Sequence, residues 1–152
     1  MRSAGAGRGR LRVVLDTNVW VSGLINPAGP PGQLLEEVRI GRIEAVLSWE
    51  LADEVLTVLA RPQLRRFQIA EEDVQELAAL FAPLLPTVDV VVTPPDPDDA
   101  VVVAAAVGGG ASVLVTGDRD LLDDRELLDW LSEHSVEVLR PAELVERLAG
   151  QR

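Results

Sequence analysis

The chain has 152 residues, of which 47% are hydrophobic and 26% charged, and a formal net charge of −11. This length and composition suit a single globular domain with a true hydrophobic core. The sequence has no cysteine and no lysine, which excludes disulfides, thiolate metal sites, cysteine nucleophiles and lysine-dependent chemistry. No apolar run reaches the roughly 20 residues that a membrane helix needs, and no signal-peptide pattern is present. We therefore expect a cytoplasmic protein that does not enter the membrane.

The acidic balance bears on the kind of partner that the chain binds. A net charge of −11 argues against ordinary electrostatic binding of nucleic acid. Two interpretations remain, an acidic enzyme of small molecules or a protein whose carboxylates hold a metal ion. In the second case the ion reverses the local charge once it is bound.

The first half of the chain alternates short apolar runs with helical patterns. Residues 1–11 are expected to form a basic, disordered lead-in, and residues 12–149 the folded domain. An apolar strand is predicted at residues 12–15, and the polar residues Asp16, Thr17 and Asn18 after it can open a helix. The further elements expected here are a helix at 33–40, a strand at 44–47, a helix at 50–60 capped by Ser48, and a helix at 71–85.

The second half of the chain continues the alternation. Strands are predicted at 87–92, 113–115 and 136–139, and helices at 100–107 and 141–148. Gly108, Gly109 and Gly110 are interpreted as a helix stop. Strands that alternate with helices predict an α/β fold with a mostly parallel sheet covered on both faces.

Four acidic residues fall where parallel strands end. Asp16 follows the first strand directly, and Asp118 follows the strand at 113–115. Glu54 lies about one turn into the helix after the second strand, and Asp99 in the first turn of the helix after the third. In a parallel sheet, ligands bind outside these carboxyl ends, so the four acids are expected on one rim.

Converging carboxylates require a positive counter-charge. Two of them about 4 Å apart repel by roughly 4 kcal/mol at an effective dielectric constant near 20. Mg²⁺ and Mn²⁺ prefer oxygen ligands and keep positions for water and substrate phosphate. A bound ion can activate a water and neutralise charge on phosphate, so no nucleophilic side chain is needed.

Several segments together resemble the PIN-domain family, especially its toxin-type (VapC-like) branch from toxin–antitoxin pairs. The similarity covers about residues 12–148, nearly the whole chain. The segments, in one-letter code, are VLDTNV at 14–19, SGL at 22–24, EVL and LARP within 54–62, DPDD at 96–99 and VTGDRDLL at 115–122. No single segment is specific, and the signal comes from their order and spacing.

The resemblance implies a three-layer α/β/α fold and a metal-dependent endoribonuclease that uses Mg²⁺ or Mn²⁺. It implies RNA products with 5′-phosphate and 3′-hydroxyl ends, a cognate antitoxin protein as partner, and a homodimer. The residues that it implies as metal ligands and catalytic acids are Asp16, Glu54, Asp99 and Asp118, with Asn18 and Thr116 as polar supports and Asp120 as an extra acid.

Several alternatives stay open at this point. Asp98 competes with Asp99 for the third acid position, although Asp99 matches the family better. A phosphohydrolase of the haloacid-dehalogenase type is disfavoured, because this sequence has no second aspartate two residues after Asp16 and no lysine. A receiver-type phosphoacceptor domain is disfavoured because it too requires a lysine. A non-catalytic PIN-like module that binds RNA or a protein, and DNA as the substrate, are further alternatives.

Other conspicuous residues have simple structural interpretations. His134 is interpreted as a surface residue, and the three tryptophans as packing or interface residues. The arginines at positions 61, 65 and 66 either contact RNA phosphates or an antitoxin, or belong to a solvated helix face.

Overall fold

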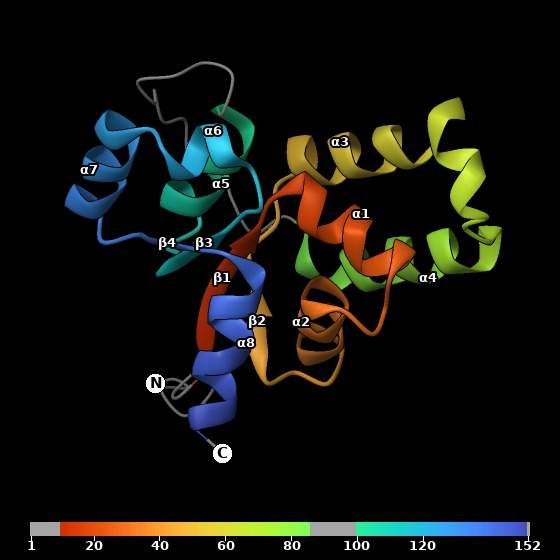
Figure 1. The fold of residues 1–152 in the computed structure, drawn as a ribbon, viewed down its shortest axis with the longest axis horizontal. Helices are drawn as coiled ribbons and strands as arrows, with labels where there is room; N and C mark the ends of the chain where they lie inside the picture. The colour runs from red at the N-terminus through yellow and green to blue at the C-terminus, as the bar shows by residue number, and fades with distance from the viewer. Residues whose placement is uncertain (1–9, 86–99, 152) are drawn as a thin grey trace.

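A four-stranded parallel sheet forms the centre of the computed structural model, which describes residues 10–85 and 100–151 (Figure 1). Its strands are β1 (Leu11–Leu15), β2 (Ile43–Ala45), β3 (Val113–Val115) and β4 (Glu137–Leu139). Their order is β2-β1-β3-β4, and all three pairings are parallel. The predicted α/β fold with a parallel sheet is confirmed. The strand expected at 87–92 and the acids Asp98 and Asp99 lie outside the described residues.

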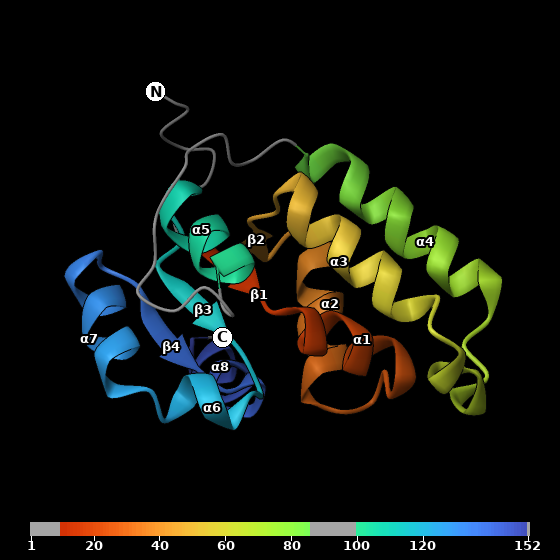
Figure 2. The ribbon, with the colours of Figure 1, turned by 90° about the horizontal axis from the view of Figure 1, so that it is seen from above.

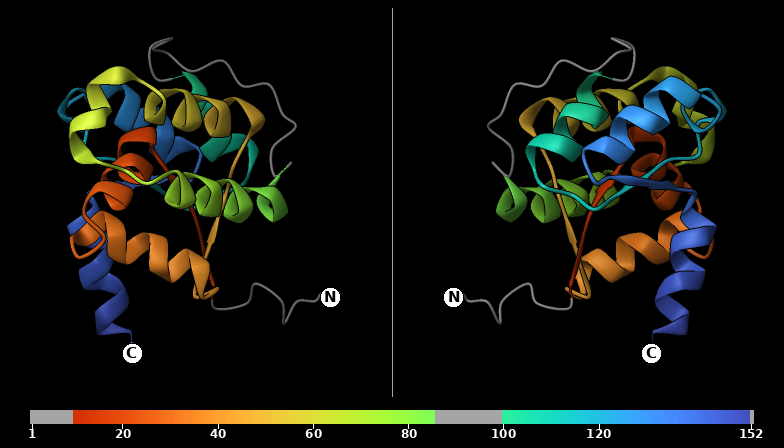
Figure 3. Two further views of the ribbon diagram at one scale, coloured as in Figure 1. Left: turned by 90° about the vertical axis from the view of Figure 1, so that its right-hand side faces the viewer. Right: turned by 90° about the vertical axis from the view of Figure 1, so that its left-hand side faces the viewer.

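Helices cover both faces of this sheet. Helix α5 (Ala100–Gly108) lies against β1 and β3 on one face. Helices α2 (Pro30–Arg39) and α8 (Pro141–Gly150) lie on the other face (Figure 2) and pack side by side (Figure 3). β3 and the last three residues of β1 are therefore apolar and buried rather than alternating. This three-layer arrangement leaves the carboxyl ends of β1 and β3 as the place where side chains of both strands can meet.

An arm of helices extends away from the sheet (Figure 1). It consists of α3 (Trp49–Leu59), the 3-10 segment η1 (Pro62–Phe67), α4 (Glu71–Phe81) and the 3-10 segment η2 (Ala82–Leu84). The remaining helices are α1 (Thr17–Ile25), α6 (Arg119–Leu122) and α7 (Arg125–Glu133). Across residues 10–85 and 100–151, no helix has both the length and the apolar character needed to cross a membrane.

The observed boundaries differ from the expected ones where prolines and caps intervene. The helix expected at 71–85 ends at Phe81, and η2 follows it, because Pro83 cannot donate a backbone hydrogen bond and disfavours helix in the residue before it. The predicted Ser48 cap is confirmed, since its hydroxyl accepts a hydrogen bond from the Leu51 N–H at 3.1 Å. Strand β1 begins at Leu11, one residue earlier than expected, and Leu11 pairs with Ile43.

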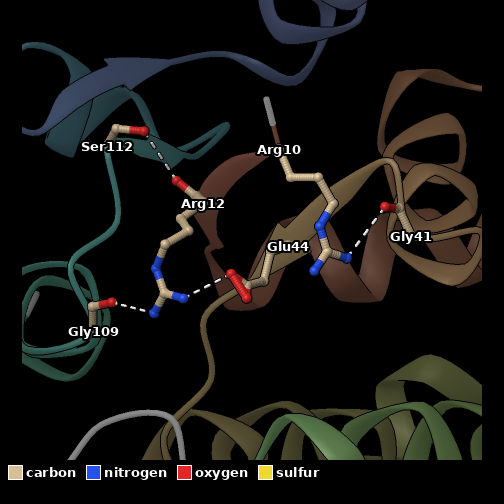
Figure 4. A network of polar contacts seen from close by, with 6 residues as sticks. All are labelled: Arg10, Arg12, Gly41, Glu44, Gly109 and Ser112. Carbon is tan, nitrogen blue, oxygen red and sulfur yellow. Dashed lines mark hydrogen bonds and ion pairs between the residues drawn. The ribbon is translucent and has the colours of Figure 1, made fainter. Parts of the chain in front are cut away.

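The amino end of the sheet is held by an arginine network (Figure 4). The Arg12 guanidinium on β1 donates to the Glu44 carboxylate on β2 at 2.7 Å and to the Gly109 carbonyl beyond α5 at 2.5 Å. The Ser112 hydroxyl in turn donates to the Arg12 carbonyl at 3.3 Å. These contacts join β1 to β2 and to the start of β3, at the end of the sheet opposite to Asp16 and Asp118.

One aromatic contact fixes the arm to the rest of the fold. Trp20 of α1 and Phe81 of α4 are both buried, and their rings meet edge to face with centroids 5.0 Å apart. Trp20 is therefore a packing residue, as predicted, whereas Trp49 is 61% exposed at the start of α3. Trp130 is partly buried against the core and its ring lies 4.1 Å from that of the exposed His134.

Phe81→Ala should destabilise the protein by about 3–5 kcal/mol, because it opens a cavity between α1 and α4. Phe67→Ala is the matched control, since Phe67 is 38% exposed and should change stability by about 0.5 kcal/mol or less. Chemical denaturation of the two variants measures this difference. Equal midpoints would show that the contact between Trp20 and Phe81 does not hold the arm.

Candidate functional site

The candidate site lies where the connections of the sheet diverge. From β1 the chain passes to β2 on one side, whereas β3 and β4 lie on the other side. In an open parallel sheet, such a switch point leaves a crevice at the carboxyl ends of the two central strands. Leu15 pairs with Val115 at these ends, and the Asp16 N–H donates to the Val115 carbonyl at 2.9 Å. The sheet itself therefore brings Asp16 beside the residues that follow β3.

The Asp16 carboxylate is held by three donors. As the N-cap of α1, it accepts a hydrogen bond from the Thr17 backbone N–H at 2.8 Å. Its other oxygen accepts hydrogen bonds from the Thr116 hydroxyl at 2.7 Å and from the Asn18 side-chain amide at 3.2 Å. Asp16 thus combines a structural role as a helix cap with a fixed orientation of its carboxylate.

Thr116 and Asn18 connect the loop after β3 to the start of α1. Thr116 is fully buried, and its hydroxyl also accepts a hydrogen bond from the Asp118 N–H at 3.0 Å. The Asn18 side-chain oxygen accepts one from the Gly117 N–H at 3.2 Å. Both residues predicted as polar supports therefore contact the Asp16 carboxylate and the loop that carries Asp118.

The other predicted acids are placed differently from one another. Glu54 lies on the exposed side of α3, and its carboxylate accepts a hydrogen bond from the Thr17 hydroxyl. Asp118 is half-buried and caps α6 by accepting a hydrogen bond from the Asp120 N–H at 2.9 Å. The Asp120 side chain is exposed and is not part of the pocket that the other acids line.

Asp16, Glu54 and Asp118 line one pocket with a volume of about 370 Å³. Its polar wall comes from the acids and their neighbours, and its apolar wall from valines of α1, α3 and α5. The full lining is Asp16, Thr17, Asn18, Val21, Ser22, Glu54, Val58, Val101, Val102 and Asp118. The sequence interpretation missed the valine wall, although helical spacing provides a signal, since Val58 lies four residues after Glu54.

The surroundings of Asp16 in the pocket disfavour the charged form of its carboxyl group. Burial raises the pKa of the Asp16 carboxyl above its ordinary value, and the charges of Glu54 and Asp118 raise it further. Hydrogen bonds from Thr116 and Thr17 act in the opposite direction and do not cancel these effects. The folded protein therefore disfavours the charged form of Asp16 unless a positive charge enters the pocket.

The oxygen atoms of the side chains that line the pocket suit a hard cation. The side chains that could bind one here are carboxylates, hydroxyls and an amide, which are the oxygen ligands that Mg²⁺ and Mn²⁺ prefer. Within residues 10–85 and 100–151, however, no group of three acidic or histidine side chains could by itself hold an ion. The three described carboxylates share a pocket without forming a closed coordination shell, and Asp99 lies outside the described residues.

Asp16→Asn should stabilise the metal-free protein at neutral pH, by on the order of 0.5–2 kcal/mol, because it removes a carboxylate that the fold disfavours in charged form. The Asp16 pKa is higher in the folded than in the unfolded protein, so the wild type loses stability as pH rises through that interval. The electrostatic gain from Asp16→Asn should therefore shrink as pH falls from the folded towards the unfolded pKa, and it should be lost below the unfolded pKa.

Thermal unfolding in EDTA across this pH range measures the effect. Asp129→Asn on α7 is the control, because Asp129 is exposed and does not line the pocket. A metal-free Asp16→Asn protein that is less stable than wild type at neutral pH would contradict the claim that the fold disfavours a charged Asp16.

Comparison with known proteins adds independent information on the same residues. A protein-family model described as "PIN domain" matches residues 12–120, which include Asp16, Glu54 and Asp118. An uncharacterized protein of Methanocaldococcus jannaschii is 29% identical over 145 residues, which cover 90% of this chain and 91% of that protein. No solved structure gave a significant match.

Proposed function

Because this chain belongs to the PIN domain family, we propose that it is a metal-dependent endoribonuclease that hydrolyses RNA phosphodiester bonds. PIN domains are generally nucleases that use divalent metal ions. The specific proposal is that this chain uses Mg²⁺ or Mn²⁺ and that RNA is its substrate. The observation that carries it is the convergence of Asp16, Glu54 and Asp118 on one pocket at the switch point of the sheet.

The proposed ligands are Asp16, Glu54, Asp99 and Asp118. Bound there, a divalent cation would supply charge neutralisation on the attacked phosphate and acidify a water molecule. Asp16 contributes a carboxylate that its three hydrogen-bond donors already orient. Glu54 contributes a carboxylate from α3, so the two acids reach the pocket from different elements.

Thr116 and Asn18 are proposed as positioning residues rather than ligands. Thr116 holds the Asp16 carboxylate and the backbone of Asp118 through one hydroxyl, which keeps the chain segments that carry the two proposed ligands together. Loss of a supporting hydrogen bond of this kind commonly lowers metal affinity or activity by about 10- to 100-fold. Asp120 acts through its backbone N–H on Asp118, and we assign its exposed carboxylate no direct role.

The physiological role that we propose is the toxin of a toxin–antitoxin pair. Its support is the resemblance of the motifs to toxin-type PIN domains, which also suggests a homodimer and a cytoplasmic location. A small antitoxin protein would then cover the acidic pocket. An antitoxin gene would neighbour this one, so the adjacent reading frame provides a direct check.

A second candidate is a PIN-like module that binds RNA or a protein without cutting. It is favoured by the finding that, within the described part of the chain, no three acidic or histidine side chains could by themselves hold a metal ion. Against it, each acid position implied by the family is filled in this sequence. The two candidates differ in whether any metal makes the chain cleave RNA.

The wild type should cleave a labelled, structured RNA with Mn²⁺ or Mg²⁺ and should not cleave it in EDTA. Asp16→Asn should lower the rate by about 100-fold or more, because it removes a proposed ligand rather than an outer support. Asp53→Asn, which changes an exposed acid outside the pocket, should cleave like wild type. Gel analysis of the products over time measures these rates.

Cleavage that persists in EDTA, or that is equal in wild type and Asp16→Asn, would overturn the proposed metal site. No cleavage of several RNAs by wild type, together with no metal binding by calorimetry, would favour the non-catalytic module.

A further inference from the structure

A cluster of basic residues follows directly after α3. Arg61 precedes η1, and Arg65, Arg66 and the aromatic Phe67 lie within it. These four residues are called the η1 basic cluster. All four side chains are exposed, and the Arg66 guanidinium lies 4.7 Å from the centre of the Phe67 ring. Gln68 ends η1 with a positive φ of 52°, which turns the chain towards α4.

The arginines of this cluster differ from several others on the surface. Arg12, Arg39, Arg42 and Arg147 each form an ion pair with a glutamate. In the part of the chain that the structure describes, no ion pair involves the arginines of the η1 basic cluster. On a chain with a net charge of −11, these arginines are therefore positive charges that form no ion pair with a carboxylate of residues 10–85 or 100–151.

Helix α3 connects the η1 basic cluster to the acidic pocket. Glu54 and Val58 both line the pocket, and the Arg61 N–H still donates to the Val58 carbonyl at 3.1 Å. Arg61 follows Glu54 by seven residues and lies two residues beyond the end of α3 at Leu59, which corresponds to about 10 Å along the direction of the helix. Figure 1 shows α3 running from the region of α1 and β1 out to this end of the arm.

A polymeric substrate would extend from the pocket onto the surrounding surface. The pocket volume of about 370 Å³ leaves room for one nucleotide-sized group, so the flanking phosphates must lie on the surface of the protein. That surface is acidic around Asp16, Glu54 and Asp118 and repels phosphates that are not close to a bound cation. A stacked strand advances about 3.4 Å per nucleotide, so about 10 Å corresponds to roughly three nucleotides.

We propose that the η1 basic cluster binds the backbone of single-stranded RNA on one side of the cleaved bond, roughly three nucleotides away. Arg61 and Arg65 contact phosphates, and the Phe67 ring, 38% exposed beside Arg66, offers a surface for a base. Arginines together with an aromatic ring are the combination that binds single strands without sequence preference. The inference rests on the proposed ribonuclease function and adds a substrate-binding surface to it.

Arg61→Gln/Arg65→Gln, called the cluster variant, tests this surface. Its charge-matched control is Arg125→Gln/Arg140→Gln, at the first residue of α7 and the residue before α8, because these arginines are also exposed and form no ion pair among the described residues. With a single-stranded RNA of about 12 nucleotides and Mn²⁺, the cluster variant should raise KM about 10-fold and leave kcat unchanged. With a dinucleotide substrate, which does not reach η1, both variants should behave like wild type. The Tm of each variant is measured alongside, and the cluster variant should keep the wild-type Tm because its arginines form no ion pair within the described part of the chain.

Binding without cleavage separates this inference from the catalytic proposal. In the Asp16→Asn background, the plot of log affinity against log salt should become shallower by about 1.4 for the cluster variant, or about 0.7 per lost phosphate contact. The control pair should leave this slope unchanged. If the wild-type protein cleaves no RNA, a reduced slope in the cluster variant would still support the RNA surface while the catalytic proposal fails.

Three results would overturn the inference. If the wild-type protein cleaves RNA and the cluster variant has the same KM and salt slope, the proposed RNA surface would be refuted and the ribonuclease proposal would stand. Equal losses in the cluster and control variants would show a bulk charge effect. A wild-type protein that neither binds nor cleaves RNA would refute both proposals, and η1 would then be examined for binding to an acidic protein.

Discussion

Strands β1 and β3 lie side by side in the centre of the sheet, and the buried Thr116 hydroxyl joins their carboxyl ends by donating to Asp16 at 2.7 Å. The same hydroxyl accepts a hydrogen bond from the Asp118 N–H, so one atom holds the Asp16 carboxylate after β1 and the Asp118 backbone after β3. A buried hydroxyl with both partners in place is costly to disturb, because either group left alone would lose hydrogen bonding without regaining water. The acidic pocket therefore depends on the pairing of the two central strands.

This arrangement works against stability in one respect. Burial and the charges of Glu54 and Asp118 disfavour the ionised form of Asp16, so the metal-free fold keeps a repulsion that only a positive charge relieves. Functional sites commonly carry such a cost, and substitutions that remove it stabilise the protein while abolishing activity. The opposite end of the sheet differs, because the Glu44 carboxylate there forms a direct ion pair with Arg12 at 2.7 Å.

The sequence predicted the parts of the site that local rules determine. Asp16 and Asp118 follow buried strands, and a parallel sheet brings such positions to one edge whatever the details of packing. Ser48 precedes an apolar helical pattern, which is a local capping signal. The valine wall and the path of the arm from α3 to α4 were not predicted, because they depend on which helices pack together over long sequence distances. The end of α4 at Phe81 was missed although Pro83 is a local signal, and Asp99 lies outside the residues that the structure describes.

The central claim is that acids from separate elements form one cation site, and calorimetric titration with Mn²⁺ tests it most directly. Glu54→Gln removes a proposed ligand, and Glu50→Gln is its matched control, one turn earlier on the same helix and outside the pocket. We predict that wild type and Glu50→Gln bind Mn²⁺ with equal affinity, whereas Glu54→Gln and Asp16→Asn bind it at least about 10-fold more weakly. Equal Mn²⁺ binding by all four proteins, or no binding by wild type, would contradict the account.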